Sequence, residues 1–383
     1  MNWNDRHTYN FPTLIRFGAG VVDELAPHLL EQGKQRPLLV TDAGLAKLDF
    51  FRFTVQQLQQ QGLQIQLFSN VDANPVKQNV LDGKSSYQES QCDSIIGFGG
   101  GAPMDVARAI ALAAHHDRDL FDFDDALGGD RHVTETIPYF VTVPTTSGTG
   151  SEVGRSTVIA EDETHKKRIL FSPRLLAQRV FADPELTLDL PPAVTAATGM
   201  DAFCHNLEAY LSRGFNPLCD GIALEGIRLV GQSLEKATHT PNMESRSQMM
   251  MAALMGATAF QKGLGIVHSL AHPLSTLLNT HHGLANAVML PFGVEFNRSV
   301  VPERIEQINL ALGLPREQNL AEWLFEYNAK LGLPTSLSAL NVTPDHVDEL
   351  AKLALEDVCH QCNPRVVGLA DFRNLYQKAL AHD

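Results

Sequence analysis

A carboxylate and several imidazoles are spaced along this chain in a way that suits a metal ion. Asp201 and His205 are four residues apart in a helical pattern, so both side chains point from one helix face. Four more histidines follow in a stretch that otherwise reads as buried helix: His268, His272, His281 and His282. Such nitrogen and oxygen ligands suit Fe(II), Zn(II), Co(II) or Mn(II). Each histidine taken singly also fits a hydrogen-bonded core residue, and spacing alone does not choose four ligands from six candidates.

A second group of residues is suited to a dinucleotide. Residues 95–105 (IIGFGGGAPMD) read as a strand, a glycine turn and a helix start, where backbone N–H groups can receive a diphosphate. Residues 144–152 (PTTSGTGSE) follow another apolar strand and offer hydroxyls and glycines for phosphate, ribose or amide contacts. Asp42 ends the first clear strand and can accept hydrogen bonds from a ribose 2′-hydroxyl, which favours NAD over NADP.

These glycines are also compatible with a simple tight turn, and they do not follow the usual Rossmann pattern. They come after roughly the third predicted strand, whereas the ordinary glycine fingerprint follows the first.

The pattern of apolar residues differs between the two halves of the chain. In the first half, apolar strand-like runs alternate with helical segments, notably 45–62 and 103–116; the runs are 37–42, 63–71, 93–98 and 139–143. This alternation predicts parallel βαβ units with helices on both faces of a sheet. After the prolines at 184, 191 and 192, long Ala-, Leu- and Met-rich periodic segments predict a helical half. We therefore expect an α/β domain over residues 1–188 and an all-helical domain over residues 189–383.

The bulk composition excludes several other classes of protein. A formal net charge of −14 argues against a nucleic-acid partner. No stretch reaches the roughly 18–20 apolar residues that span a bilayer, and the opening residues lack the basic start and apolar run of a signal peptide. Five cysteines make no disulfide framework, and the Cys359–Cys362 pair lacks a second ligand pair for structural zinc. We expect a cytoplasmic protein without a membrane partner.

Several motifs, spread over essentially the whole chain, resemble the iron-containing, group III alcohol dehydrogenases, the family of lactaldehyde:propanediol oxidoreductase and 1,3-propanediol dehydrogenase. The motifs are FPTLIRFGAG at 11–20, GGGAPMD at 99–105, PTTSGTGSE at 144–152, DPELT at 183–187, GMDAFCHNLE at 199–208 and GLGIVHSLAHPLSTLLNTHHGLANAVMLP at 263–291. The resemblance implies an α/β N-terminal dinucleotide-binding domain with a parallel sheet and an all-α, dehydroquinate synthase-like C-terminal metal-binding domain. It also implies reversible hydride transfer between NAD(H) and a small alcohol, diol or aldehyde, in a homodimer or higher homo-oligomer.

Carried over position by position, the resemblance implies that Fe(II), or alternatively Zn(II), is bound by Asp201, His205, His268 and His282. It implies that His272 is not a ligand but lies beside the nicotinamide, where an imidazole can relay a proton. It implies that His281 either supports the ligand residues without binding the metal or has a structural role. Contacts to the dinucleotide are implied for Asp42, Asn74, Gly99, Gly100, Gly101, Asp105, Thr145, Thr146, Thr149 and Lys167.

The chain departs from the family pattern at two places. Ala102 stands where the family usually has Ser, and Gly154-Arg155 replaces a Thr followed by a small or apolar residue. Arg155 is interpreted either as a solvated surface charge or as a contact for an anionic substrate end.

Three other interpretations stay open. Glycerol dehydrogenases and dehydroquinate synthases, a related branch, lack the pattern of one Asp and three His ligands. A metal-dependent hydrolase would bind no dinucleotide, so tight NAD(H) binding excludes it. A non-catalytic nucleotide- or metal-binding protein would give no alcohol-dependent NADH formation.

Overall fold

The computed structural model describes residues 11, 13–164 and 166–382. The opening residues 1–10, on which the expectation about a signal peptide rests, lie outside this range. The described chain divides into two compact units. The α/β unit comprises the described residues of 13–146 and 151–188, and the helical unit comprises residues 11, 147–150 and 189–382.

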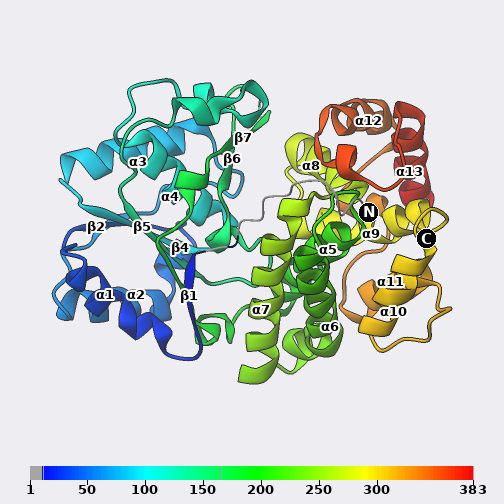
Figure 1. Ribbon diagram of the computed structural model, residues 1–383, viewed down its shortest axis with the longest axis horizontal. Coiled ribbons are helices and arrows are strands. Elements are labelled where there is room, and N and C mark those ends of the chain that lie inside the picture. Colours follow the sequence, from blue (N-terminus) through cyan, green and yellow to red (C-terminus); the bar gives the residue numbers. More distant parts are fainter. Residues whose placement is uncertain (1–10, 12, 165, 383) are drawn as a thin grey trace. The chain divides into compact units, whose positions relative to one another are not determined.

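A six-stranded sheet forms the centre of the α/β unit, and all its paired strands run parallel. Its strand order is β1-β8-β5-β4-β2-β3 (Figure 1). The strands are β1 (Leu14–Phe17), β2 (Pro37–Val40), β3 (Gln66–Phe68), β4 (Ser94–Gly99), β5 (Tyr139–Pro144) and β8 (Arg179–Ala182). A separate antiparallel pair, β6 (Ser156–Ala160) and β7 (Lys167–Phe171), was not expected from the sequence.

Helices cover both faces of this sheet, as its apolar strands require. Successive side chains of a strand point to opposite faces, so in β4 Ile95 packs into one core and Ile96 into the other. Helices α1 (Leu25–Glu31) and α2 (Asp49–Gln60) cover the Ile96 face. Helices α3 (Lys77–Glu89) and α4 (Gly101–Ala113) cover the Ile95 face (Figure 1). The predicted α/β fold with a parallel sheet is confirmed.

Two local predictions need correction. The helix expected over 45–62 is interrupted, because Leu45–Lys47 form a 3-10 turn, Leu48 is extended (φ −77°, ψ 142°) and α2 begins at Asp49. The glycine motif follows the fourth strand in chain order and not roughly the third, because β1 precedes the strands that were predicted. β1 lies at the sheet edge with a half-exposed pattern and Leu14 is 54% exposed, so it has no buried apolar run to reveal it.

The helical unit contains no strand among its described residues, which confirms the prediction of an all-helical second half. Its helices are α5 (Pro192–Leu211), α6 (Pro217–His239), α7 (Met243–Ala259), α8 (Ile266–Leu278), α9 (His282–Asn297), α10 (Pro302–Ala311), α11 (Leu320–Lys330), α12 (Val347–Glu356) and α13 (Leu369–Ala381). Every residue of α5 from Thr195 to Leu211 is buried. A helix buried on all sides lies inside the bundle, so polar side chains on α5 are held away from water.

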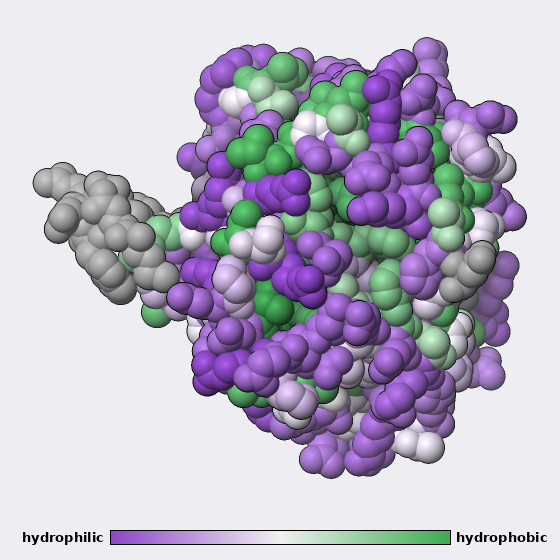
Figure 2. Space-filling model, turned by 90° about the vertical axis from the view of Figure 1, so that its right-hand side faces the viewer, coloured by the Kyte–Doolittle hydropathy of each residue, from purple (hydrophilic) through white to green (hydrophobic). Residues whose placement is uncertain are grey.

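No single described helix is long and apolar enough to span a bilayer; by length and composition only the pair formed by α7 with its following turn and α8, bent by 108°, meets the requirement. The face in Figure 2 is mostly hydrophilic, with hydrophobic residues lying between hydrophilic ones. Large exposed apolar side chains such as Val366 (80% exposed) occur on the described surface. Such residues are common on ordinary protein surfaces, whereas buried polar side chains are informative.

Candidate metal centre

Three buried polar residues line up on one face of α5. Asp201, His205 and Glu208 follow one another at spacings of four and three residues, which places them on adjacent turns of the same helix face. They are 2%, 5% and 3% exposed. Buried polar groups of this kind need partners to repay the loss of water, and the partners of Asp201 and Glu208 come from α8 and α9.

α8 and α9 bring histidines to this face of α5. His268 lies in the first turn of α8 and His272 one turn later. His282 is the first residue of α9, and Gly283 lies directly against α5. A Cβ atom at Gly283 would stand 2.3 Å from the carbonyl oxygen of Ala197, so only glycine lets the start of α9 approach α5 this closely.

Four of the six candidate ligands come together in the structure. Each of Asp201, His205, His268 and His282 offers one ligand atom, and these four atoms lie within 4.8 Å of one another. Asp201 Oδ1 is 3.4 Å from His282 Nε2 and 3.9 Å from His205 Nε2. Four ligands at about 2.1 Å around a tetrahedral ion would be about 3.4 Å apart. The donor types and their spacing therefore fit a divalent metal ion.

The other two histidines have different positions. The ring of His272 stacks on that of His282, with centroids 5.3 Å apart and planes 19° apart, but His272 is outside the group of four. His281 is exposed and forms the N-terminal boundary of α9.

Two further groups of potential ligands overlap with this centre: Cys204, Glu208 and His268, and His272, Asp357 and Cys359. In both, the carboxylate is already hydrogen-bonded to the imidazole. The group of four is therefore the better candidate for a cation.

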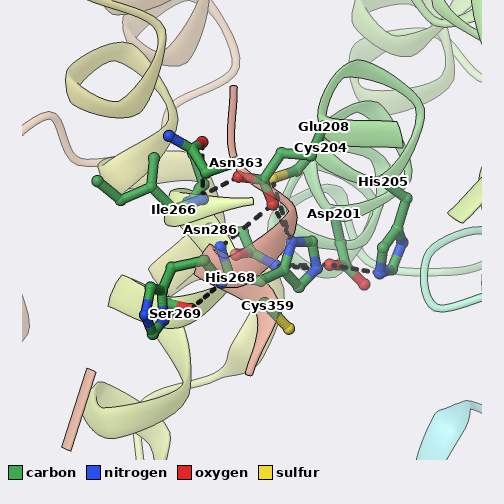
Figure 3. Close-up of polar contacts among 12 residues, drawn as sticks. Asp201, Cys204, His205, Glu208, Ile266, His268, Ser269, Asn286, Cys359 and Asn363 are labelled. Carbon is green, nitrogen blue, oxygen red and sulfur yellow. Dashed lines mark hydrogen bonds and ion pairs between the residues drawn. The ribbon is translucent and has the colours of Figure 1, made fainter. Parts of the chain in front are cut away.

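Glu208 orients His268, as Figure 3 shows. Its Oε2 accepts a hydrogen bond from His268 Nδ1 at 2.6 Å, and its two oxygens also accept from the backbone N–H groups of Val267 (2.7 Å) and His268 (3.3 Å). One carboxylate thus satisfies two free N–H groups at the start of α8 and leaves His268 Nε2 with a lone pair for a metal. Glu208 was not among the residues predicted from the sequence, although its position seven residues after Asp201 was a usable signal.

Asp357 orients His272 in the same manner. Its Oδ2 accepts from His272 Nδ1 at 2.7 Å, and its Oδ1 accepts from the Ser269 hydroxyl at 2.6 Å. Burial alone would raise the pKa of Asp357, but the charge and hydrogen bond of His272 outweigh it and hold that pKa well below its usual range. Asp357 is 85 residues from His272 in sequence, so no local signal could have identified it.

Burial and neighbouring charges separate the pKa values of two histidines in this centre. Burial lowers the pKa of His205 to about 4, so this imidazole is neutral near pH 7. Burial also acts to lower the pKa of His268, but the hydrogen bond and charge of Glu208 outweigh it, and the pKa of His268 is raised. A neutral imidazole is the form that binds a metal.

In the α/β unit, the predicted dinucleotide residues occupy the carboxyl ends of adjacent strands. After β2 the chain forms β3 on one side and then crosses to β4 on the other, so the strand order reverses between β2 and β4. Ligands of open α/β sheets bind at such a point. Asp42 follows β2, and its Oδ1 accepts from the N–H groups of Gly44 (2.8 Å) and Leu45 (2.9 Å).

The glycine loop lies between β4 and α4. Gly99 has a φ of 147°, and a Cβ there would stand 2.8 Å from Pro103, so the backbone needs glycine. Gly100 forms the N-terminal boundary of α4, where free N–H groups favour an anion. Thr145 N donates to the carbonyl of Gly99 at 2.9 Å, and the side chain of Thr146 lies next to Gly100. These contacts join the segment after β5 to the glycine loop.

The remaining predicted dinucleotide residues are dispersed. Asp105 accepts from Arg108 (3.1 Å), the Ser151 hydroxyl (2.6 Å) and the N–H of Val158 (3.0 Å), so its carboxylate holds the loop after β5. Direct contact of Asp105 with a dinucleotide stays a prediction. Asn74 precedes α3, Thr149 lies in the segment 147–150 of the helical unit, and Lys167 begins β7.

Two charged residues after β5 have unusual surroundings. Glu152 is 1% exposed, and burial raises its pKa to about 7 although Arg108 acts in the opposite direction. Arg155 is half-buried with its guanidinium over the Phe171 ring, 5.5 Å from the ring centroid, and burial lowers its pKa. No acidic partner of Arg155 was found in the described part of the chain.

Comparison with known proteins agrees with these features. Residues 12–184 match the family model described as iron-containing alcohol dehydrogenase, and residues 195–380 match the C-terminal model of the same family. The chain is 38% identical to 4-hydroxybutyrate dehydrogenase of Cupriavidus necator, over 96% of this chain and 98% of that protein. It is 31% identical to NAD-dependent methanol dehydrogenase of Bacillus methanolicus, over 96% and 98%. A solved structure of 1,3-propanediol oxidoreductase is 33% identical, with a TM-score of 0.92 over 98% of this chain and 100% of that one.

Proposed function

The chain belongs to the iron-containing alcohol dehydrogenase family, and we propose that its metal centre consists of Asp201, His205, His268 and His282. It is an NAD-dependent oxidoreductase of the alcohol dehydrogenase type. The observation that carries the proposed centre is the convergence of these four ligand atoms within 4.8 Å in a buried part of the helical unit.

The metal ion, when bound, supplies Lewis acidity toward an alcohol or carbonyl oxygen, and NAD(H) carries the hydride. Asp201 provides the one negative charge among the four donors, so a divalent cation keeps a net charge near +1. We propose Fe(II) as the physiological metal on the strength of the family. The donor atoms fit Zn(II) equally well, and affinity order alone favours zinc over iron.

We assign the dinucleotide to the carboxyl edge of the sheet in the α/β unit. In this proposal Asp42, which follows β2, accepts from the ribose, and the N-terminus of α4 with Gly99–Gly101 receives the diphosphate; the free N–H groups at that helix start support it. On the resemblance to the family alone, we also propose contacts to the dinucleotide by Asn74, Asp105, Thr145, Thr146, Thr149 and Lys167.

We propose His272 as the catalytic residue that moves a proton. Its side chain is 25% exposed, its Nδ1 is held by Asp357, and its ring stacks on His282. An imidazole held in this way has one nitrogen free to exchange a proton with solvent or substrate.

For the substrate, we propose a short primary alcohol with a second polar group at its far end, or the matching aldehyde. This proposal follows the names of two relatives, 4-hydroxybutyrate dehydrogenase and 1,3-propanediol dehydrogenase. The alternative that Arg155 contacts the anionic end of a hydroxy acid is tested by the Arg155→Ala variant below.

The test is an anaerobic assay of NADH formation with metal-stripped protein reconstituted with Fe(II). Alcohol-dependent NADH formation that is lost on chelation and restored by Fe(II) supports the proposal. Full turnover of the metal-stripped protein contradicts it. The panel contains 4-hydroxybutyrate, 1,3-propanediol and methanol, and Arg155→Ala should raise the KM for 4-hydroxybutyrate much more than that for 1,3-propanediol.

We also propose a cytoplasmic homodimer or higher homo-oligomer. All five cysteines are free thiols, which suits a reducing compartment. Analytical ultracentrifugation tests the oligomeric state, and a monomer at micromolar concentration contradicts it.

A further inference from the structure

Asn286 occupies the centre of the proposed metal site. It lies one turn after His282 on α9 and is 0% exposed, and Figure 3 shows its amide among the ligand side chains. Its Nδ2 is 2.8 Å from Asp201 Oδ1, 3.1 Å from His282 Nε2 and 3.4 Å from His268 Nε2. These three atoms are the ones that would bind the cation.

The chemistry of the neighbours determines which end of the amide faces them. His268 Nδ1 is used by Glu208, so its Nε2 carries a lone pair, and Asp201 Oδ1 is an acceptor as well. A carbonyl oxygen facing these acceptors would add a further repulsive lone pair, whereas an N–H edge attracts them. The positive N–H edge of the Asn286 amide therefore faces the acceptor atoms of Asp201, His268 and His282.

The other end of the amide makes no competing contact. Asn286 Oδ1 is buried and has no hydrogen-bond partner in the structure. Burying such an acceptor without a partner is costly. An apolar side chain of similar size at this position would not carry that cost.

We propose that Asn286 is a fifth residue of the metal site, and that its amide N–H edge takes the place of the cation while the site is empty. The proposal rests on the metal centre proposed above. The amide relieves the repulsion among Asp201, His268 and His282 in the metal-free protein, and this contact is given up when a cation binds the same atoms. Asn286 therefore stabilises the empty site and weakens metal binding.

The effect of Asn286 on metal affinity is opposite to that of a residue that supports a ligand from behind. A partner such as Glu208 contacts the far nitrogen of a ligand, and losing such a partner typically weakens metal binding. Asn286 contacts the ligand atoms themselves, so losing it removes a competitor. A net hydrogen bond to a charged group corresponds to about a tenfold to hundredfold change in affinity.

The test uses Zn²⁺ as the probe, with Asn286→Ala and Asn286→Leu as the variants. The dissociation constant is measured by competition with a chromophoric chelator, and thermal unfolding is followed for the metal-free and the Zn²⁺-loaded protein. We expect both variants to bind Zn²⁺ about tenfold or more tightly. We expect the Tm to fall in the metal-free protein and to stay close to that of the wild type in the loaded protein.

Asn309→Ala is the matched control. Asn309 is also 0% exposed, its Nδ2 donates to the carbonyls of Arg316 and Gln318, and its Oδ1 likewise has no hydrogen-bond partner in the structure. Its loss should lower both Tm values equally and leave Zn²⁺ affinity unchanged. Unchanged or weaker Zn²⁺ binding in both Asn286 variants, or equal Tm losses with and without Zn²⁺, overturns the inference.

A second control separates this inference from the proposed function. If Asp201→Ala does not weaken Zn²⁺ binding, the metal centre itself is wrong, and the inference falls with it. If Asp201→Ala weakens binding while the Asn286 variants bind like the wild type, the metal centre stands and only the role of Asn286 is refuted.

Discussion

Replacing Glu208 by Gln should weaken metal binding although it changes a single atom. Glu208 is 3% exposed and accepts three hydrogen bonds, from His268 Nδ1 and from the backbone N–H groups of Val267 and His268. Glutamine offers one acceptor oxygen and one donor nitrogen in the same volume. Whichever way its amide is turned, one of the buried N–H groups now faces a donor.

This mismatch can lower either the stability of the fold or the affinity for the metal. A buried donor left without a partner costs about 1–3 kcal/mol, and the free energy of unfolding falls by that amount. Alternatively, His268 shifts its proton from Nδ1 to Nε2 and accepts from the glutamine N–H. That tautomer has no lone pair on Nε2 for a metal, so the cost appears as weaker metal binding.

We expect the Zn²⁺ dissociation constant of Glu208→Gln to rise about 10- to 100-fold, which is the usual effect of losing a partner behind a metal-binding histidine. Competition with a chromophoric chelator measures it, and urea unfolding of the metal-free protein measures the stability loss. Glu225→Gln is the control, because Glu225 is a solvent-facing carboxylate paired with Arg228 at the helix surface. A Glu208→Gln variant that binds Zn²⁺ within twofold of the wild type refutes the assigned tautomer.

Three further predictions concern other parts of the molecule. His272→Ala should lower kcat about 100-fold or more, the usual contribution of a positioned acid or base. It should leave the Zn²⁺ dissociation constant within twofold, since His272 is outside the group of four donors. Equal kcat values and pH profiles for the variant and the wild type would show that His272 does not take part in the reaction. Asp42→Ala should raise kcat/KM with NADP⁺ relative to NAD⁺ about tenfold or more, because it removes a charge that repels a 2′-phosphate; an unchanged ratio shows that Asp42 does not contact the ribose. Burial raises the pKa of Glu152 from an ordinary 4.5 to about 7, so its neutral form stabilises the fold below pH 4.5, and this stability is lost as the pH rises to about 7. At pH 8, urea unfolding of Glu152→Gln should therefore give a free energy of unfolding about 3 kcal/mol higher than that of the wild type. Equal pH dependence of the stability of the two proteins would falsify this prediction.

Much of the local structure could be predicted from the sequence because its causes are local. The apolar runs at β2, β4 and β5 and the glycines between β4 and α4 carry the signals of buried parallel strands and a strand–turn–helix unit. The half-exposed β1 and the break at the extended Leu48 before α2 were missed, since edge strands and short breaks leave no such pattern.

The sequence by itself determined the residue types for the proposed chemistry and their placement on helix faces, since Asp201, His205 and Glu208 repeat with the period of one helix. Only the tertiary structure decided which histidines meet Asp201. His268, His272 and His282 are all near one another in sequence, but the packing of α8 and α9 against α5 places two of them in the group of four and leaves His272 to Asp357. The physical reason is that helix packing depends on distant close contacts, such as Gly283 against Ala197, which a periodic pattern does not encode. Asn286 and Asp357 acquired their partners through that packing alone.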